Sequence, residues 1–445
     1  MKPPSIRFVV PGNFIPERRY TADVVFKEFL ALDYELVVDA SLTDSYLLQM
    51  GEKQIIFKDS FFAQKNEAAG YLHESNIPSN ISRANGRFVL HDHLPVLFGS
   101  PHISVASEKI NCGIDIFASI FFMISRWEEA VIKELDYLSR FPVHASLADK
   151  NDFLARPVVN EWLALLKNLM KELMPALAFQ SPQPYQLVFT HDIDFMKRPV
   201  SLREYAKDIV KRKSLRSLLT RMSYHLSKEN PYDLFDYFMD VSERHNTVSR
   251  FYFMTGHNLP GKDGENYNNT RAYLATLKKI KERGHVIGFH PSLLSYNNDA
   301  IFKKELRQLE KDCGGMQIRE GRQHALRFEM PETWQLWNSN NMELDSTLGF
   351  SAKPGFRCGT GNTFSTFDVV RRVPMSLKEM PLIVMDTTLN VNQKLSLDKS
   401  EECIRHFIDV ARKHDMPITL LFHNLINDKI GWRGWKTMYD KIFFS

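Results

Sequence analysis

Carboxylate, imidazole and guanidinium side chains recur in the second half of this chain, directly after or close to short apolar segments. The residues concerned are Asp192, Asp194, His290, His324, Arg357, Asp386 and His423. Aspartate and histidine together suit zinc or a similar divalent ion, which polarises a carbonyl and lowers the pKa of bound water. A free carboxylate can accept the proton of that water, and a histidine can protonate the leaving group. An arginine can hold the carboxylate in place through a bidentate pair. These residue types therefore favour a metal-assisted hydrolase.

The elements that must position these residues alternate between strand and helix from about residue 184 to the end. We expect strands at 186–190, 250–254, 285–289, 381–385 and 417–422. We expect helices at 232–244, 272–282, 302–312 and 401–413, and a short one opened by Pro331. Such alternation predicts a parallel sheet, and about 260 residues is the size of a βα barrel. Because the carboxyl ends of parallel strands share one edge, six segments would deliver these side chains to one rim.

The first part of the chain carries no comparable catalytic pattern. Two prolines within Ser181-Pro-Gln-Pro-Tyr185 place a boundary there, so we predict an N-terminal domain of residues 1–180 and a second of residues 184–445. We expect the N-terminal domain to be a smaller α/β domain. Its expected strands are 6–10, 34–39 and 54–58, and its expected helices are 114–130 and 161–173. His91, Asp92 and His93 are ligand types, but no further ligand lies close by in sequence, which favours a polar loop.

Composition narrows the classes of protein. Lys+Arg 57 against Asp+Glu 53 gives a net charge of +4, too mild to indicate nucleic-acid binding. Four scattered cysteines form neither a disulfide framework nor a CxxC pair. The most apolar stretch, 114–124, is too short to span a bilayer, and no secretion signal precedes Asn13, so we expect a cytoplasmic protein without an integral membrane segment.

One segment, Lys197–Arg221, is strongly basic, with nine Lys and Arg residues against two acidic ones. A solvated helical insertion explains this composition. The alternative is a basic lip that attracts an anionic substrate or makes contact with a membrane surface.

Four motifs, taken in order, resemble a known family. Thr190-His-Asp-Ile-Asp194, Gly284-His-Val-Ile-Gly-Phe-His290, Gly355-Phe-Arg357 and Leu420-Leu-Phe-His423 are similar to the motifs of the polysaccharide deacetylases of carbohydrate esterase family 4. The resemblance covers about residues 184–430. It implies the NodB-homology module, a distorted βα barrel, and hydrolysis of a non-peptide amide on an N-acetylated amino sugar or polysaccharide.

The resemblance also implies a role for each matching residue. Asp192 matches the carboxylate base, Asp194 and His290 match metal ligands, Arg357 matches the arginine that orients the base, Asp386 matches the carboxylate that tunes the acid, and His423 matches the general acid. His285 matches a histidine that is not a ligand. The cofactor implied is a divalent metal, zinc first, with cobalt, nickel, manganese or iron as alternatives.

The chain departs from the family where a second histidine normally follows four residues after the first. Leu294 stands there. We predict that His324, in the next βα unit, replaces the missing ligand; the alternative is that His324 binds substrate or has a structural role. A decayed site would leave a carbohydrate-binding or scaffold protein of the same fold. A further alternative is that the N-terminal domain covers the rim and selects the substrate.

For several other polar and aromatic residues, the sequence gives weaker evidence of a functional role. The segment Gly359-Thr-Gly-Asn362 reads as an ordinary turn rather than a substrate-side loop. Asp345 and His257 could line the pocket or have structural roles. Four tryptophans are expected in the core rather than on a sugar platform, namely Trp334, Trp337, Trp432 and Trp435.

Overall fold

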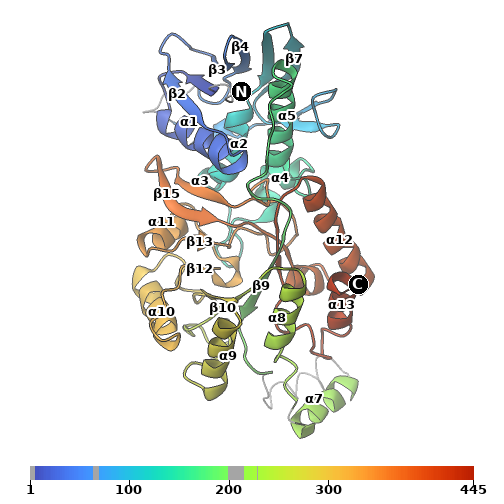
Figure 1. Cartoon of the computed structure of the whole chain (residues 1–445). Helices are drawn as coiled ribbons and strands as arrows, with labels where there is room; N and C mark the ends of the chain where they lie inside the picture. Colours follow the sequence, from blue (N-terminus) through green and yellow to red (C-terminus); the bar gives the residue numbers. More distant parts are fainter. Residues whose placement is uncertain (1–5, 64–69, 199–214, 228, 445) are drawn as a thin grey trace.

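The computed structural model describes residues 6–63, 70–198, 215–227 and 229–444. It contains two large sheets, and the strands of each come from one side of the predicted boundary at 181–185. Figure 1 shows the N-terminal sheet at one end of the molecule and the second sheet below it. Within the described residues, no helix is both long enough and apolar enough to cross a bilayer.

The second sheet has nine strands in the order β14-β15-β13-β12-β11-β10-β9-β17-β16 and curls into an open half-barrel (Figure 1). Its strands are β9 (Leu187–Ile193), β10 (Ser249–Phe253), β11 (Val286–Phe289), β12 (Glu320–Gly321), β13 (Leu344–Asp345), β14 (Phe364–Asp368), β15 (Val373–Glu379), β16 (Leu382–Met385) and β17 (Ile418–Leu421). Every neighbouring pair is parallel except β14 with β15. The predicted parallel α/β arrangement is confirmed, but the sheet does not close.

Helices connect these strands and end where the local sequence requires. They are α7 (Leu215–Ser227), α8 (Phe235–Arg244), α9 (Arg271–Glu282), α10 (Asp299–Asp312), α11 (Glu332–Ser339), α12 (Leu397–Lys413) and α13 (Trp435–Phe443), with the short turns η4 (His324–Leu326) and η5 (Thr388–Asn392). The Thr270 hydroxyl accepts a hydrogen bond from Tyr273 N at 3.3 Å and caps α9. Gly284 ends it with a φ of 74°, a left-handed conformation that glycine adopts without strain.

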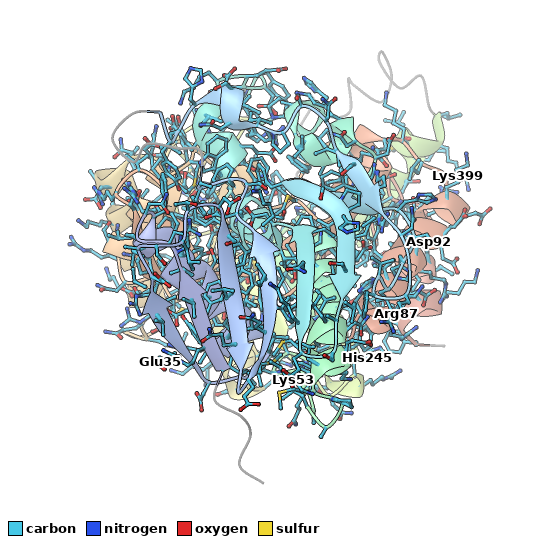
Figure 2. All side chains as sticks on the ribbon, turned by 90° about the horizontal axis from the view of Figure 1, so that it is seen from above. Glu35, Lys53, Arg87, Asp92, His245 and Lys399 are labelled. Atoms are coloured by element: carbon cyan, nitrogen blue, oxygen red, sulfur yellow. The ribbon has the colours of Figure 1, made fainter. Side chains whose placement is uncertain are left out.

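The N-terminal sheet has six strands in the order β2-β1-β3-β4-β8-β7. They are β1 (Ile6–Val10), β2 (Tyr34–Val38), β3 (Ser45–Met50), β4 (Lys53–Lys58), β7 (Gly99–Val105) and β8 (Lys109–Ile114), and a separate pair joins β5 (Ser82–Ala84) to β6 (Leu94–Val96). The helical elements are α1 (Ile15–Ala22), η1 (Asp23–Phe29), η2 (Glu74–Asn76), α2 (Ile116–Ile124), α3 (Trp127–Val131), η3 (Val143–Ala145), α4 (Leu147–Lys150) and α5 (Val158–Leu173). Figure 2 looks onto this sheet, with Glu35 of β2 and Lys53 of β4 labelled.

The single helix predicted over residues 114–130 was wrong. Ile114 ends β8, and the Asp115 carboxylate caps α2 by accepting a hydrogen bond from Ala118 N at 3.2 Å. The helix then breaks at Arg126, whose φ of 52° is left-handed. The buried Arg126 guanidinium bonds to Glu128 and Glu129 of α3 and holds this break in place.

The two parts of the chain share one continuous hydrophobic core. Tyr20 of α1 packs against Phe367 of β14 in a tilted arrangement with ring centroids 4.7 Å apart, and its hydroxyl donates to Ser365 O at 2.7 Å. Arg372, after β14, donates two hydrogen bonds to the buried Glu17 carboxylate at 2.6 and 2.9 Å. Division into domains at 181–185 therefore stays a proposal that rests on the separation of the two sheets.

Candidate active site

A cavity of about 640 Å³ lies at the carboxyl ends of the half-barrel strands. It is lined by six of the seven residues selected from the sequence, namely Asp192, Asp194, His290, His324, Arg357 and His423. Asp192 is the last but one residue of β9, and His290 directly follows β11. The seventh residue, Asp386, follows β16 and is fully buried behind His423. These segments are distant in sequence, and they meet here because the carboxyl ends of parallel strands lie at one rim of the sheet.

Asp194, His290 and His324 form a compact group in this cavity. Their ligand-type atoms all lie within 4.8 Å of one another. The Nε2 atoms of His290 and His324 lie 3.4 and 3.7 Å from Asp194 Oδ1. That oxygen is buried and makes no well-formed hydrogen bond to any described residue, so it is free to accept a cation. The predicted replacement of the histidine missing at position 294 by His324 therefore remains a proposal.

The outer nitrogens of both imidazoles are held by fixed partners. His290 Nδ1 donates to Arg322 O at 2.7 Å, which leaves Nε2 with a free lone pair toward Asp194. His324 Nδ1 lies 3.2 Å from Asp263 Oδ1. The Asp263 carboxylate is fixed in turn by the backbone N–H groups of Leu259 and Leu293 at 2.7 and 2.9 Å. Such partners orient metal-ligating histidines and strengthen them as ligands.

The electrostatics of this group favour a positive charge at its centre. Burial alone would raise the pKa of Asp194, but the facing imidazoles of His324 and His290 hold that pKa well below its usual range. Burial alone would lower the pKa of His290, but the carboxylates of Asp192 and Asp194 raise it. Protons on the imidazoles or a divalent ion can satisfy these carboxylates, and each excludes the other. The residues present therefore fit the divalent ion that the sequence motifs imply.

Asp192 stands beside this group and is oriented by Arg322. Arg322 Nη1 donates to Asp192 Oδ1 at 2.9 Å and to the Thr190 hydroxyl at 3.0 Å. The guanidinium is fully buried and is fixed from the other side by Ser346, through its carbonyl and its hydroxyl, both at 2.8 Å. Asp192 Oδ2 is left toward the cavity, 3.9 Å from His290 Nε2.

The predicted pairing of Arg357 with Asp192 was wrong. Arg357 donates instead to both oxygens of Glu129 on α3, at 2.8 and 2.6 Å, and to Gly349 O at 2.8 Å. Both partners of this ion pair are buried. The physical reason is that the N-terminal part of the chain brings a carboxylate to Arg357, so that Arg357 lines the cavity wall while Arg322 holds Asp192.

His423 lies just after β17 and faces the same cavity. Its Nδ1 lies 2.7 Å from Asp386 Oδ1, and its backbone N–H donates to Asp386 Oδ2 at 2.7 Å. Burial alone would lower the pKa of His423, but the Asp386 carboxylate raises it to about 9. The imidazole therefore carries a proton at neutral pH, with Nε2 available toward the cavity.

A loop of the N-terminal part forms one wall of the cavity. All residues of the loop 136–144 except Ser139 line the cavity, although sequence reasoning found no function for them. Arg140 ties this loop to the half-barrel by donating to Ala325 O at 2.7 Å, next to His324. Leu326 and Met385 also line the cavity and belong to a small apolar cluster with Leu382 and Leu421.

Several weaker sequence candidates lie away from the cavity. His285 hydrogen-bonds to Ser249 N and Glu243, and His257 Nδ1 lies 3.2 Å from Gly264 O. Asp345 is buried in the sheet beside Thr347, and Gly359 packs against α5 through its carbonyl, which accepts from Val159 N at 2.9 Å. The four tryptophans expected in the core are all buried, namely Trp334, Trp337, Trp432 and Trp435. Of the basic segment Lys197–Arg221, residues 199–214 lie outside the described residues.

The structure brings two further ligand types to His91. Glu161 and His414 lie close enough for the three ligand-type atoms to be within 4.8 Å of one another. Glu161, however, is already paired with Arg156 through both oxygens, at 3.0 and 2.6 Å, and Lys413 Nζ is 3.4 Å from His91 Nδ1. These cations oppose a metal ion, and we assign none to this cluster.

Sequence reasoning missed two contributors to the site. The role of partner to Asp192 was predicted for Arg357, whereas Arg322 holds that position in the structure. Asp263 carried no signal, because it follows Gly261-Lys262 in a loop without a recognisable motif. Its position against His324 follows only from the packing of that loop.

The chain as a whole is a mixed α/β protein with an open, largely parallel half-barrel and an Asp/His cavity at its rim. The N-terminal part matches a family described as "Family of unknown function (DUF7033)" over residues 6–175. No curated protein matches the sequence.

Two solved structures are similar to the chain. A candidate polysaccharide deacetylase from Mycobacterium smegmatis is 14% identical, with a TM-score of 0.40, covering 60% of this chain and 85% of the other. A candidate glycoside hydrolase/deacetylase from Parabacteroides distasonis is 10% identical, with a TM-score of 0.37, covering 59% and 68%. Because identity is so low, function must be inferred from the side chains of this chain itself.

Proposed function

We propose that this protein is a metal-dependent hydrolase that removes the acyl group from an N-acetylated amino sugar or a polysaccharide that contains one. The observation that carries the proposal is that Asp192 and His423 line the same cavity as the Asp194–His290–His324 group. A base, an acid and a set of cation ligands thus surround one space large enough for a sugar.

The metal would be held by Asp194 Oδ1 and the Nε2 atoms of His290 and His324. The donor set of one carboxylate and two imidazoles suits zinc first, and also cobalt, nickel, manganese or iron. When bound, such an ion polarises the acyl carbonyl and lowers the pKa of a neighbouring water.

The chain's own residues move the protons. Asp192 accepts the proton of the attacking water, and Arg322 holds that carboxylate so that its other oxygen is directed into the cavity. His423 donates its proton to the amide nitrogen as the carbon–nitrogen bond breaks, so that the sugar leaves as a free amine. Asp386 keeps His423 protonated and fixes its ring. The apolar side chains of Leu326 and Met385 line the space available for the methyl group of the acyl chain.

The proposal is tested by acetate release from N-acetylated oligosaccharides with purified protein reconstituted with zinc or cobalt. We expect Asp192→Asn and His423→Ala each to lower turnover by about 10²–10⁴-fold, the usual contribution of a positioned acid or base. His406→Ala is a matched control, because His406 is exposed on α12 and does not line the cavity. Wild-type rates in either active-site variant would refute the assigned roles.

The rival function is a carbohydrate-binding protein of the same fold without turnover. It predicts glycan binding with no acetate release under any metal, and glycan affinity that is unchanged by removal of the ion. The hydrolase predicts acetate release that disappears on chelation and returns with the metal. The wall formed by residues 136–144 gives the N-terminal part a place in substrate selection under either function.

A further inference from the structure

Helix α7 presents an unusual apolar stripe to solvent. Leu215, Leu219, Met222 and Leu226 are 70%, 56%, 45% and 78% exposed. Their spacing of four, three and four residues places them along one face of the helix. Isolated exposed apolar residues are ordinary, but four on one face of a single helix indicate a surface that meets another apolar phase.

The opposite face of α7 is anchored to the body of the protein. Tyr224 is 6% exposed, and its hydroxyl accepts a hydrogen bond from Lys429 N at 3.0 Å. Arg221 is also buried on this side. The helix is therefore held in a defined orientation with the apolar stripe directed outward, and Figure 1 shows it projecting at the end of the molecule away from the N-terminal sheet.

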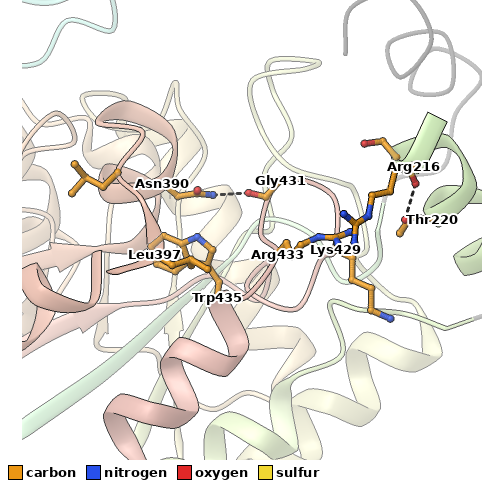
Figure 3. A pocket seen from close by; sticks show the side chains of 10 residues that line it. Arg216, Thr220, Asn390, Leu397, Lys429, Gly431, Arg433 and Trp435 are labelled. Carbon is orange, nitrogen blue, oxygen red and sulfur yellow. Dashed lines mark hydrogen bonds between the residues drawn. The ribbon is translucent and has the colours of Figure 1, made fainter. Parts of the chain in front are cut away.

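A basic pocket adjoins the helix. It has a volume of about 320 Å³ and includes the exposed side chains of Arg216, Lys429 and Arg433 (Figure 3). In the part of the chain that the structure describes, none of these three cations takes part in an ion pair. The pocket is thus suited to an anionic group such as a phosphate diester.

Consecutive residues of the chain line the basic pocket and the candidate active site. Asn390 lines the basic pocket and donates to Gly431 O at 2.9 Å. The following residues, Val391 and Asn392, line the active-site cavity, and Val391 is 52% exposed. The turn η5 therefore contributes residues to both.

We propose that α7 and this basic pocket dock the protein on the surface of a bilayer that contains anionic lipid. An amphipathic helix binds at such an interface with its apolar side chains among the acyl chains, while nearby Lys and Arg residues attract anionic headgroups. A symmetric contact with a second copy is disfavoured, because it would bring Arg216 and its basic neighbours close to their own counterparts. The inference does not depend on the hydrolase proposal.

The test is co-sedimentation of the full chain with vesicles of phosphatidylcholine alone or mixed with phosphatidylglycerol. We expect binding to the mixed vesicles that weakens with added salt, and little binding to neutral ones. The variant Leu215→Ser/Leu219→Ser/Met222→Ser/Leu226→Ser and the variant Arg216→Glu/Lys429→Glu/Arg433→Glu should each lower the partition coefficient by at least about 10-fold.

Matched controls carry the same changes elsewhere on the surface. Val38→Ser/Val370→Ser removes exposed apolar side chains, and Lys278→Glu/Lys281→Glu/Lys304→Glu reverses exposed charges; both should bind like the wild type. Asp192→Asn should also bind like the wild type, which separates docking from turnover. An unchanged thermal melting curve shows that each variant is folded.

Three outcomes would overturn the proposal. They are equal affinity for neutral and anionic vesicles, wild-type binding by both α7-region variants, and absence of vesicle binding together with self-association that the stripe variant abolishes. The last outcome would instead identify a second copy of the chain as the occupant of the stripe.

Discussion

Arg322 donates a hydrogen bond from Nη1 to Asp192 Oδ1 at 2.9 Å, while its own carbonyl accepts one from His290 Nδ1 at 2.7 Å. One residue thus fixes both the proposed base and a proposed metal ligand. Because the guanidinium is fully buried and Arg is always charged, Asp192 faces a permanent cation across the pair. The short segment that follows β12 therefore orients both Asp192 and His290.

Substitution of Arg322 should impair turnover more than substitution of Arg357. Arg322→Lys keeps the charge but loses the fixed geometry of the guanidinium, and we expect kcat to fall by at least about 10-fold. Arg357→Lys should alter kcat less than this, because Arg357 contacts Glu129 rather than Asp192. Steady-state kinetics of both variants, at temperatures where each is fully folded, checks the difference. A larger loss of kcat for Arg357→Lys would show that Arg357 holds the base after all.

Metal affinity should depend on Asp263 although it is not one of the proposed ligands. Asp263→Asn weakens the partner of His324 Nδ1, and loss of such a partner costs about 10–100-fold in affinity. His324→Ala should lose more, because it removes the ligand atom itself. Titration of chelator-treated protein with zinc by calorimetry measures both. His257→Ala is the control, and stoichiometric zinc retained by His324→Ala would reject the predicted ligand set.

The acidic form of His423 should persist well above neutral pH. Its pKa is raised to about 9 from an ordinary value of 6.5, so turnover should fall as pH rises through about 9, where the proton is lost. Asp386→Asn removes the carboxylate that favours the charged imidazole, and the alkaline limb should move to lower pH. Imidazole chemical shifts of His423 in metal-free protein give the same pKa without activity. An alkaline limb that Asp386→Asn leaves in place would assign it to another group.

The Glu129–Arg357 pair should stabilise the junction between the two parts of the chain. Both side chains are buried, so Glu129→Gln leaves a buried guanidinium with one ionic partner fewer, at a cost of about 3–5 kcal/mol in the free energy of unfolding. Glu172→Gln in the exposed pair with Arg87 should change it by less than about 1 kcal/mol. Urea denaturation measures both. Equal effects would show that the buried pair does not hold the junction.

The strands and helices of the half-barrel could be predicted from the sequence because each is determined by neighbouring residues. The strands at 250–254, 285–289 and 417–422 and the helix stopped by Gly284 appear in the structure within a few residues, since apolar period and glycine punctuation act over neighbouring residues. The break between α2 and α3 at Arg126 could not be predicted from the sequence. It depends on a buried contact with Glu128 and Glu129 rather than on any helix-breaking residue.

Most residues of the candidate site could likewise be predicted from the sequence, but the contacts between them could not. The sequence by itself determined which aspartates and histidines end parallel strands, and hence that Asp192, Asp194, His290 and His423 share a rim. Only the tertiary structure decided that Arg322 rather than Arg357 meets Asp192, that Asp263 supports His324, and that residues 136–144 wall the cavity. Each of these depends on segments far apart in the chain whose contacts are set by packing of the whole core, and no local pattern records which arginine a buried carboxylate will reach.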